Sequence, residues 1–187
     1  MIEIMEGNNQ MELNKLIKEA LATGFTVAAE IKTDTLRFMP EVRNMCKADL
    51  CHSYNKNWTC PPACGTIEEC AARASKYSSG ILVQCVGNLE DSFDIDGMEA
   101  LSRRHKECFE KLLEGLRSQK VDFLSLGAGA CTICTKCSYP DNPCRFPDKA
   151  VTSMEASGLW VSDVCVKNGV AYNYGTGKMA YTSCVLI

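Results

Sequence analysis

Histidine is scarce in this sequence, since among its 187 residues only His52 and His105 carry an imidazole. Two such residues cannot build a His-rich metal site, so thiolates must dominate any metal ligation. An excess of positive charge is also missing, because the formal net charge is −3, and we therefore expect no nucleic-acid partner. The glycine patterns G-x-G-x-x-G and Walker A are absent, which argues against nucleotide binding.

Long apolar runs are missing too. No stretch comes near the roughly 20 apolar residues that a membrane-spanning helix needs. The opening residues Met1–Glu6 include two glutamates and are not followed by the apolar run of a secretory leader. We expect a cytoplasmic protein with no membrane partner, in a compartment that keeps thiols reduced.

Cysteine, by contrast, is abundant, with 13 residues. A secreted disulfide scaffold does not fit, because the chain is long enough to form its own core and the number of cysteines is odd. Four cysteines fall within apolar helix or strand patterns and are predicted to be core thiols: Cys85, Cys108, Cys165 and Cys184. Eight of the others crowd into two loops, which indicates metal binding.

The denser loop places Cys131, Cys134 and Cys137 at every third position, and Cys144 follows a proline-rich turn. C-x2-C-x2-C with a remote fourth cysteine is a usual way of holding a 4Fe–4S cluster, which is our interpretation of the loop. Zinc is the alternative, although structural zinc sites more often use two separate C-x2-C pairs. Arg145 follows the last of these cysteines in a stiff Pro-rich segment and is a candidate to hydrogen-bond the cofactor.

The second loop contains Cys46, Cys51, Cys60 and Cys64 at irregular spacing. We interpret it as a second cluster loop, with zinc or no metal as the alternatives. Cys70 follows in the first turn of a helix, where it is either a core thiol or the reserve ligand in place of Cys64.

Hydrophobic periodicity and capping signals predict a single α/β domain over residues 1–187, with a mainly parallel or mixed sheet of four to five strands flanked by helices. The predicted helices begin near Asn9, at the capping boxes of Thr66 and Thr152, and near Met98. The predicted strands are 26–31, 81–86, 121–126, 171–174 and 180–187, the last two forming an antiparallel hairpin at an edge.

The order helix, strand, cysteine loop, capped helix, strand occurs twice, in pseudo-halves 9–87 and 98–187. If both loops leave parallel strands, they open at the same edge of the sheet and the two cysteine groups meet. The alternative is that the halves only look alike and that the loop 46–64 lies on a remote face.

Three segments, Tyr54–Pro62, Cys131–Pro147 and Ser153–Gly158, make the chain resemble the cysteine-rich predicted metal-binding protein family, a domain of unknown function found in anaerobic bacteria and methanogens. The resemblance implies metal bound by cysteine, with iron–sulfur as the expected kind, and no settled reaction. The ligands it implies are Cys46, Cys51, Cys60, Cys131, Cys134, Cys137 and Cys144.

These observations predict a small iron–sulfur protein with one or two 4Fe–4S clusters that exchanges electrons with a redox partner protein. An iron–sulfur enzyme is the second hypothesis, in which an iron with an open coordination position binds substrate, or the cluster serves an organic or corrinoid cofactor. A zinc-stabilised interaction module is the third.

Overall fold

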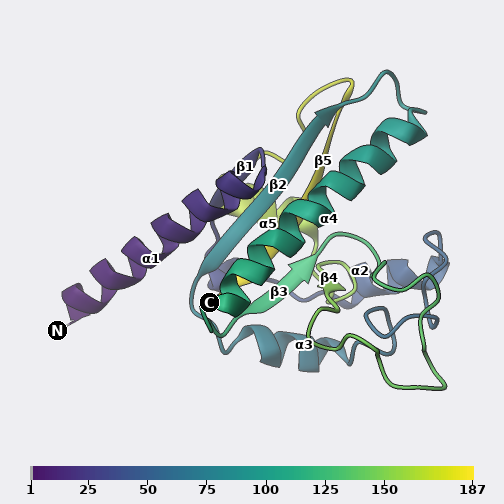
Figure 1. The fold of residues 1–187 in the computed structure, drawn as a ribbon, viewed down its shortest axis with the longest axis horizontal. Helices are drawn as coiled ribbons and strands as arrows, with labels where there is room; N and C mark the ends of the chain where they lie inside the picture. The colour runs from purple at the N-terminus through teal and green to yellow at the C-terminus, as the bar shows by residue number, and fades with distance from the viewer. Residues whose placement is uncertain (1) are drawn as a thin grey trace.

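A single five-stranded mixed sheet forms the centre of the molecule (Figure 1). The computed structural model describes the backbone of residues 2–187 and the side chains from residue 12 onward. In chain order the elements are α1 Ile2–Thr23, β1 Val27–Glu30, the 3-10 helix η1 Thr33–Thr35, α2 Pro40–Met45, the 3-10 helix η2 Cys46–Ala48, α3 Ile67–Ala74, β2 Gly80–Asn88, α4 Ile95–Ser118, β3 Leu124–Gly127, β4 Thr152–Ser153, α5 Val161–Lys167 and β5 Lys178–Leu186.

The strands lie in the order β1-β2-β5-β3-β4. The pairs β1/β2, β2/β5 and β3/β5 are antiparallel, and β3/β4 is parallel, so the predicted mixed sheet is confirmed. The predicted edge hairpin is wrong, because β5 runs through the middle and residues 171–174 form no strand. The end of β5 is buried on both faces from Thr182 to Leu186, which is the environment of a central strand.

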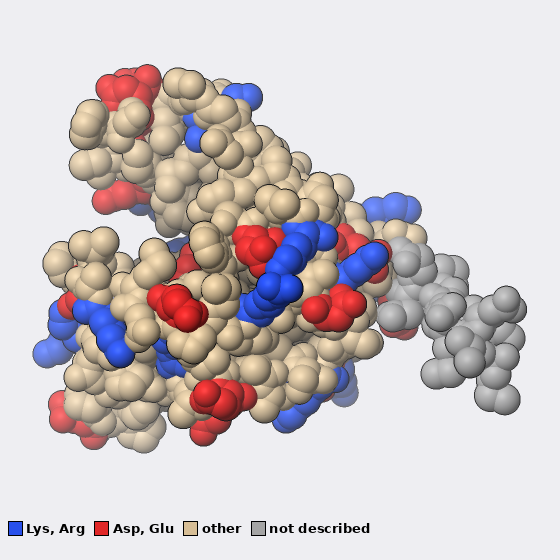
Figure 2. Space-filling model, turned by 180° about the vertical axis from the view of Figure 1, so that it is seen from behind, with Lys and Arg blue, Asp and Glu red and all other residues tan. Residues whose placement is uncertain are grey.

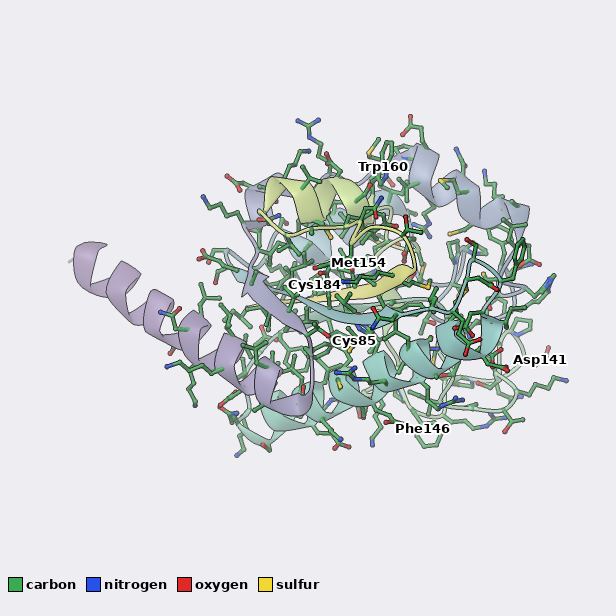
Figure 3. The ribbon with its side chains drawn as sticks, turned by 90° about the horizontal axis from the view of Figure 1, so that it is seen from above. Cys85, Asp141, Phe146, Met154, Trp160 and Cys184 are labelled. Atoms are coloured by element: carbon green, nitrogen blue, oxygen red, sulfur yellow. The ribbon has the colours of Figure 1, made fainter. Side chains whose placement is uncertain are left out.

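Helices cover the two faces of the sheet, as Figure 3 shows from above. On one face α1 and α4 pack on β2 through residues such as Leu16, Leu113 and Cys85. On the other face α5 packs on the sheet through residues such as Val164 and Cys184. The four cysteines predicted to be core thiols are all buried, which confirms that part of the prediction: Cys85, Cys108, Cys165 and Cys184.

Capping signals were correct at one position and misleading at two. The predicted box at Thr66 begins α3, where the Thr66 hydroxyl accepts from the Glu69 N–H and the Glu69 carboxylate accepts from the Thr66 N–H. The box at Thr152 begins no helix, because Thr152 and Ser153 pair with β3 as strand β4 instead. Helix α1 begins at Ile2 rather than near Asn9, whose side chain lies outside the described residues.

None of the helices in the described residues combines the length and apolar character that crossing a bilayer requires. Acidic and basic side chains alternate over the face seen in Figure 2, without a broad area of one sign. On that face the surface therefore offers no large electrostatic footprint.

Candidate metal centre

The first cysteine loop reaches the second by an unexpected route. Strands β1 and β3 run in opposite directions, so the idea that both loops leave parallel strands at one edge is wrong. After β1 the chain instead turns back along α5. The Lys32 N–H donates to Oδ1 of Asn168 at 2.8 Å near the end of α5, and the Met39 N–H donates to the Gly158 carbonyl at 2.7 Å before its start. This return carries α2 and the loop 46–64 to the end of the sheet where β3 finishes.

Direct contacts join the two loops there. The Asn57 side-chain amide donates to the Cys131 carbonyl at 3.3 Å, and the Trp58 indole N–H donates to the Asn142 carbonyl at 3.0 Å. The Trp58 and Tyr139 rings meet edge to face with their centroids 4.9 Å apart. The alternative that placed the first loop on a remote face is thereby excluded, and Trp58 serves as a packing contact between the loops.

The four cysteines of the second loop line one cavity of about 490 Å³, together with residues of the first loop from His52 to Thr59. A volume of this size is within the range of small-ligand sites. All four thiols are half-buried. Burial raises the pKa of Cys131, and the neighbouring thiols of Cys144, Cys134 and Cys137 raise it further. The thiols are therefore close enough to influence one another, and a metal that needs thiolates must displace their protons.

Three thiols of the first loop form a second group. Burial, and then the Cys51 charge, raise the pKa of Cys60 to about 11, with smaller effects of Cys46 and Cys131 in the same direction. The pKa of Cys46 is raised by burial first, then by Cys51 and Glu155. Thiols of both loops thus act on the pKa of Cys60, and the Cys131 thiol has the smallest of these effects.

Cys64 makes its contacts elsewhere. Its sulfur accepts from Nη2 of Arg43 at 3.3 Å and lies 3.6 Å from the Ala156 carbonyl. The Cys70 thiol in turn donates to the Cys64 carbonyl at 3.9 Å. Metal ligation by Cys64 stays a prediction, and its sulfur already contacts Arg43 and the Ala156 carbonyl.

Arg145 lies at the rim of the 490 Å³ cavity. Its Nη1 donates to the Lys136 carbonyl at 2.9 Å, and the side chain is exposed. This bond ties the end of the loop to its middle and leaves the remaining guanidinium donors for a cofactor or for water. A contact between Arg145 and a cofactor stays a prediction.

The donor set fits a soft metal. Within the described residues, no three Cys, His, Asp or Glu side chains are already gathered to hold a metal ion. The seven cysteines that the family resemblance implies as ligands nevertheless offer only sulfur, which suits iron–sulfur clusters and zinc and does not suit hard cations such as Mg²⁺. These are Cys46, Cys51, Cys60, Cys131, Cys134, Cys137 and Cys144.

Two arginines beside the thiols were missed by sequence reasoning. Arg73 lies three residues after Cys70 on a capped helix, a spacing that places both side chains on one face, so this signal was available. Arg43 belongs to a segment whose pattern is ambiguous, and only the turn of the chain along α5 brings it to Cys64. Local patterns could not have identified that contact.

Comparison with known proteins gives one match. Residues 29–187 match the family model described as Predicted metal-binding protein (DUF2284). No curated protein and no solved structure matches the chain.

Proposed function

The chain belongs to this family of predicted metal-binding proteins, and we propose that its metal is a 4Fe–4S cluster held by the second cysteine loop. The observation that carries the proposal is the common cavity lined by all four thiols of that loop: Cys131, Cys134, Cys137 and Cys144. Their C-x2-C-x2-C spacing with a remote fourth cysteine is suited to the four corners of such a cluster. When bound, the cluster would accept and release single electrons.

Electron transfer to or from a partner protein is the function that this arrangement supports best. Cys51 is exposed, and Ile133 and Phe146 present apolar surface beside the loop, with exposed fractions of 42% and 43%. A cluster in such a surface loop lies close to any protein that docks on it. The chain's own residues would hold the cluster, limit its contact with water and offer the docking surface.

The first cysteine group supports a second metal site. Cys46, Cys51 and Cys60 interact with one another, and Cys60 also interacts with Cys131 of the second loop. Two clusters held by loops in contact would be close enough for electrons to pass between them. Because the Cys64 sulfur contacts Arg43 and the Ala156 carbonyl, we count three protein thiolates in this first site.

A three-thiolate site favours an enzyme as the second candidate. An iron with three protein ligands keeps a position open for a substrate, which it can polarise as a Lewis acid. Cys46 and Cys51 line a cavity of about 600 Å³ whose wall is largely apolar, with Leu50, Trp160 and Tyr172 among its residues. An organic substrate or cofactor is the kind of molecule that such a wall would bind.

Metal analysis of anaerobically purified protein tests the proposal. We expect iron and acid-labile sulfide in equal amounts, with absorbance near 400 nm. Cys134→Ser should remove about half of the iron if two clusters are present, because it removes one ligand of the second loop only. Cys108→Ala, at a buried position in the core on α4, is the control and should keep its full iron content.

Stoichiometric zinc without sulfide would overturn the iron–sulfur proposal and favour the zinc-stabilised interaction module. If the protein contains iron and sulfide, electron paramagnetic resonance of its reduced form distinguishes one cluster from two, because neighbouring clusters broaden each other's signals. A single uncoupled signal at full iron loading would remove the second cluster from the proposal.

A further inference from the structure

The cavity of about 600 Å³ beside Cys46 and Cys51 is built from α2 and the loop that follows it, the turn before α5, the start of α5 and Tyr172. It shares no wall residue with the cavity of about 490 Å³ in the second cysteine loop. Figure 3 shows Trp160 at the start of α5, on the side toward α2. The two cavities are therefore separate sites, and this one has its own chemistry.

Large apolar side chains in this wall are exposed to solvent. Met45 and Leu50 have exposed fractions of 73% and 88%, and Trp160 and Tyr172 are exposed as well. Exposed apolar side chains that gather around one hollow are typical of a binding surface, because leaving them in water is unfavourable. An occupant of the cavity would therefore need an apolar body.

The charged groups of the wall are all of one sign. Glu41 and Glu155 belong to it, whereas its described residues include no lysine or arginine. Within the part of the chain that the structure describes, neither glutamate forms an ion pair, and the side chain that hydrogen-bonds Glu155 is the neutral Ser153. The first turn of α5 adds at most about half an elementary positive charge. Two carboxylates outweigh that effect, so the wall attracts a cation.

Glu155 is held in place by a well-packed turn. It is exposed, but Met154, Ala156 and Ser157 around it are at most 3% exposed. The Ser153 hydroxyl accepts from the Ala156 N–H at 3.0 Å, and the Ser157 hydroxyl donates to the Ser153 carbonyl at 3.0 Å. The turn thus presents one side chain to the cavity from a fixed backbone, which lowers the entropic cost of binding.

Trp160 and Tyr172 add aromatic faces to the same wall. Among the described residues, neither ring packs against another aromatic ring. The face of an aromatic ring attracts cations, and alkylated ammonium ions are recognised in this way because they are bulky and weakly hydrated. Carboxylates and aromatic faces in one apolar cavity therefore favour the same class of ligand.

We propose that this cavity binds an organic ammonium ion with an apolar body. The positive nitrogen lies near the two carboxylates and the aromatic rings, and the apolar body contacts Met45 and Leu50. A neutral molecule would leave both carboxylates without a partner, and an anion would be repelled by them. The inference rests on the second candidate function, because it names the kind of molecule that would be the substrate of that site.

The test measures binding to the metal-loaded protein by isothermal titration calorimetry. Its three probes share a benzyl group and differ in charge: benzyltrimethylammonium, benzyl alcohol and phenylacetate. We expect benzyltrimethylammonium to bind at one site per chain, about tenfold or more tighter than benzyl alcohol, and phenylacetate not to bind.

Variants locate the site. Glu155→Gln and Trp160→Leu should each weaken binding of benzyltrimethylammonium about fivefold, since each removes one attraction for the cation. Glu155→Gln should leave the weaker binding of benzyl alcohol unchanged. The matched controls are Glu99→Gln and Phe93→Leu, which change exposed side chains outside the wall and should not alter binding.

Three results would overturn the proposal. One is phenylacetate or benzyl alcohol binding as tightly as benzyltrimethylammonium, and another is unchanged binding of the cation in both Glu155→Gln and Trp160→Leu. The third is loss of metal in Glu155→Gln, which would make Glu155 a ligand. Metal and sulfide are measured on the same samples, so the two proposals fail separately. Full iron without cation binding would remove only the ammonium site, and zinc with cation binding would remove only the cluster.

Discussion

Acid should destabilise the protein through His105, which is only 1% exposed. Its Nε2 is hydrogen-bonded to Oγ of Ser183 at 2.6 Å, and within the described residues its Nδ1 is a buried side-chain atom without a hydrogen-bond partner. The Phe25 and Phe109 rings lie against it. Burial, and secondly the charge of Lys106, lower the pKa of His105 from 6.5 to about 4.

The sign follows from the two states. Because the pKa is lower in the folded state, the unfolded chain takes up a proton below pH 6.5 that the folded chain refuses until about pH 4. His105 therefore has no effect on the pH dependence of stability above about pH 7 and lowers stability as the pH falls. The loss amounts to about 2 kcal/mol at pH 5 and about 3 kcal/mol at pH 4, from about 1.36 kcal/mol per pKa unit.

His105→Gln isolates this effect, because glutamine can hydrogen-bond Ser183 but does not titrate. At pH 7 the variant should be less stable than the parent, since it loses the ring contacts with Phe25 and Phe109. The difference in unfolding free energy, measured by urea denaturation of the metal-loaded proteins, should shrink by about 2 kcal/mol between pH 7 and pH 5. Loss of metal in acid would affect both proteins and cancel in the difference.

Phe109→Leu is the matched control, because it weakens the same cluster without removing a titrating group. Its stability difference from the parent should not change with pH. A difference for His105→Gln that stays constant from pH 7 to pH 5 would refute the burial argument. So would equal pH dependence in the Phe109→Leu control.

Two further outcomes follow from the metal centre. Arg145→Ala removes a positive charge at the rim of the cavity and should make the reduction potential, measured by voltammetric titration, more negative without loss of iron. Lys149→Ala is the control in the same titration, because the Lys149 side chain pairs with Glu110 at 3.7 Å and Glu114 at 3.6 Å. Removal of the metal by a chelator should lower the melting temperature and expose thiols, because metal binding is coupled to folding of the loops. An apo-protein that melts like the loaded form would contradict this, as calorimetry and thiol counting can show.

Elements with strong local patterns could be predicted. The continuous apolar run from Ile81 to Val86 gave the central strand β2, and the apolar face of residues 98–116 gave α4. The capping box at Thr66 gave the start of α3, because the reciprocal hydrogen bonds involve only neighbouring residues. Weak or ambiguous patterns failed. The box at Thr152 has the same pattern of Thr followed three residues later by Glu. There, however, pairing with β3 takes the backbone hydrogen bonds that a helix would need.

The strand order could not be derived from local patterns. Helix-linked strands are often parallel neighbours, which suggested a shared edge for the two loops. In the structure β5 inserts between β2 and β3, and β1 and β3 point in opposite directions. The loops still meet, because residues 32–39 return along α5. The meeting of the loops was one of two alternatives that the sequence left open, and it comes about for a different reason than parallel strands.

The number, spacing and grouping of the thiols are properties of the chain itself, and the sequence alone therefore determined the prediction that cysteine is the metal ligand. It also determined which cysteines are buried on strands and long helices, since burial there follows the period of the element. The tertiary structure decided which thiols lie around the same cavity. It gathered Cys131 and its neighbours around one cavity and brought Arg43 from another segment to the Cys64 sulfur. Contacts between distant segments set the charged neighbours and the solvent exposure of each sulfur, and no local sequence pattern predicts either of them.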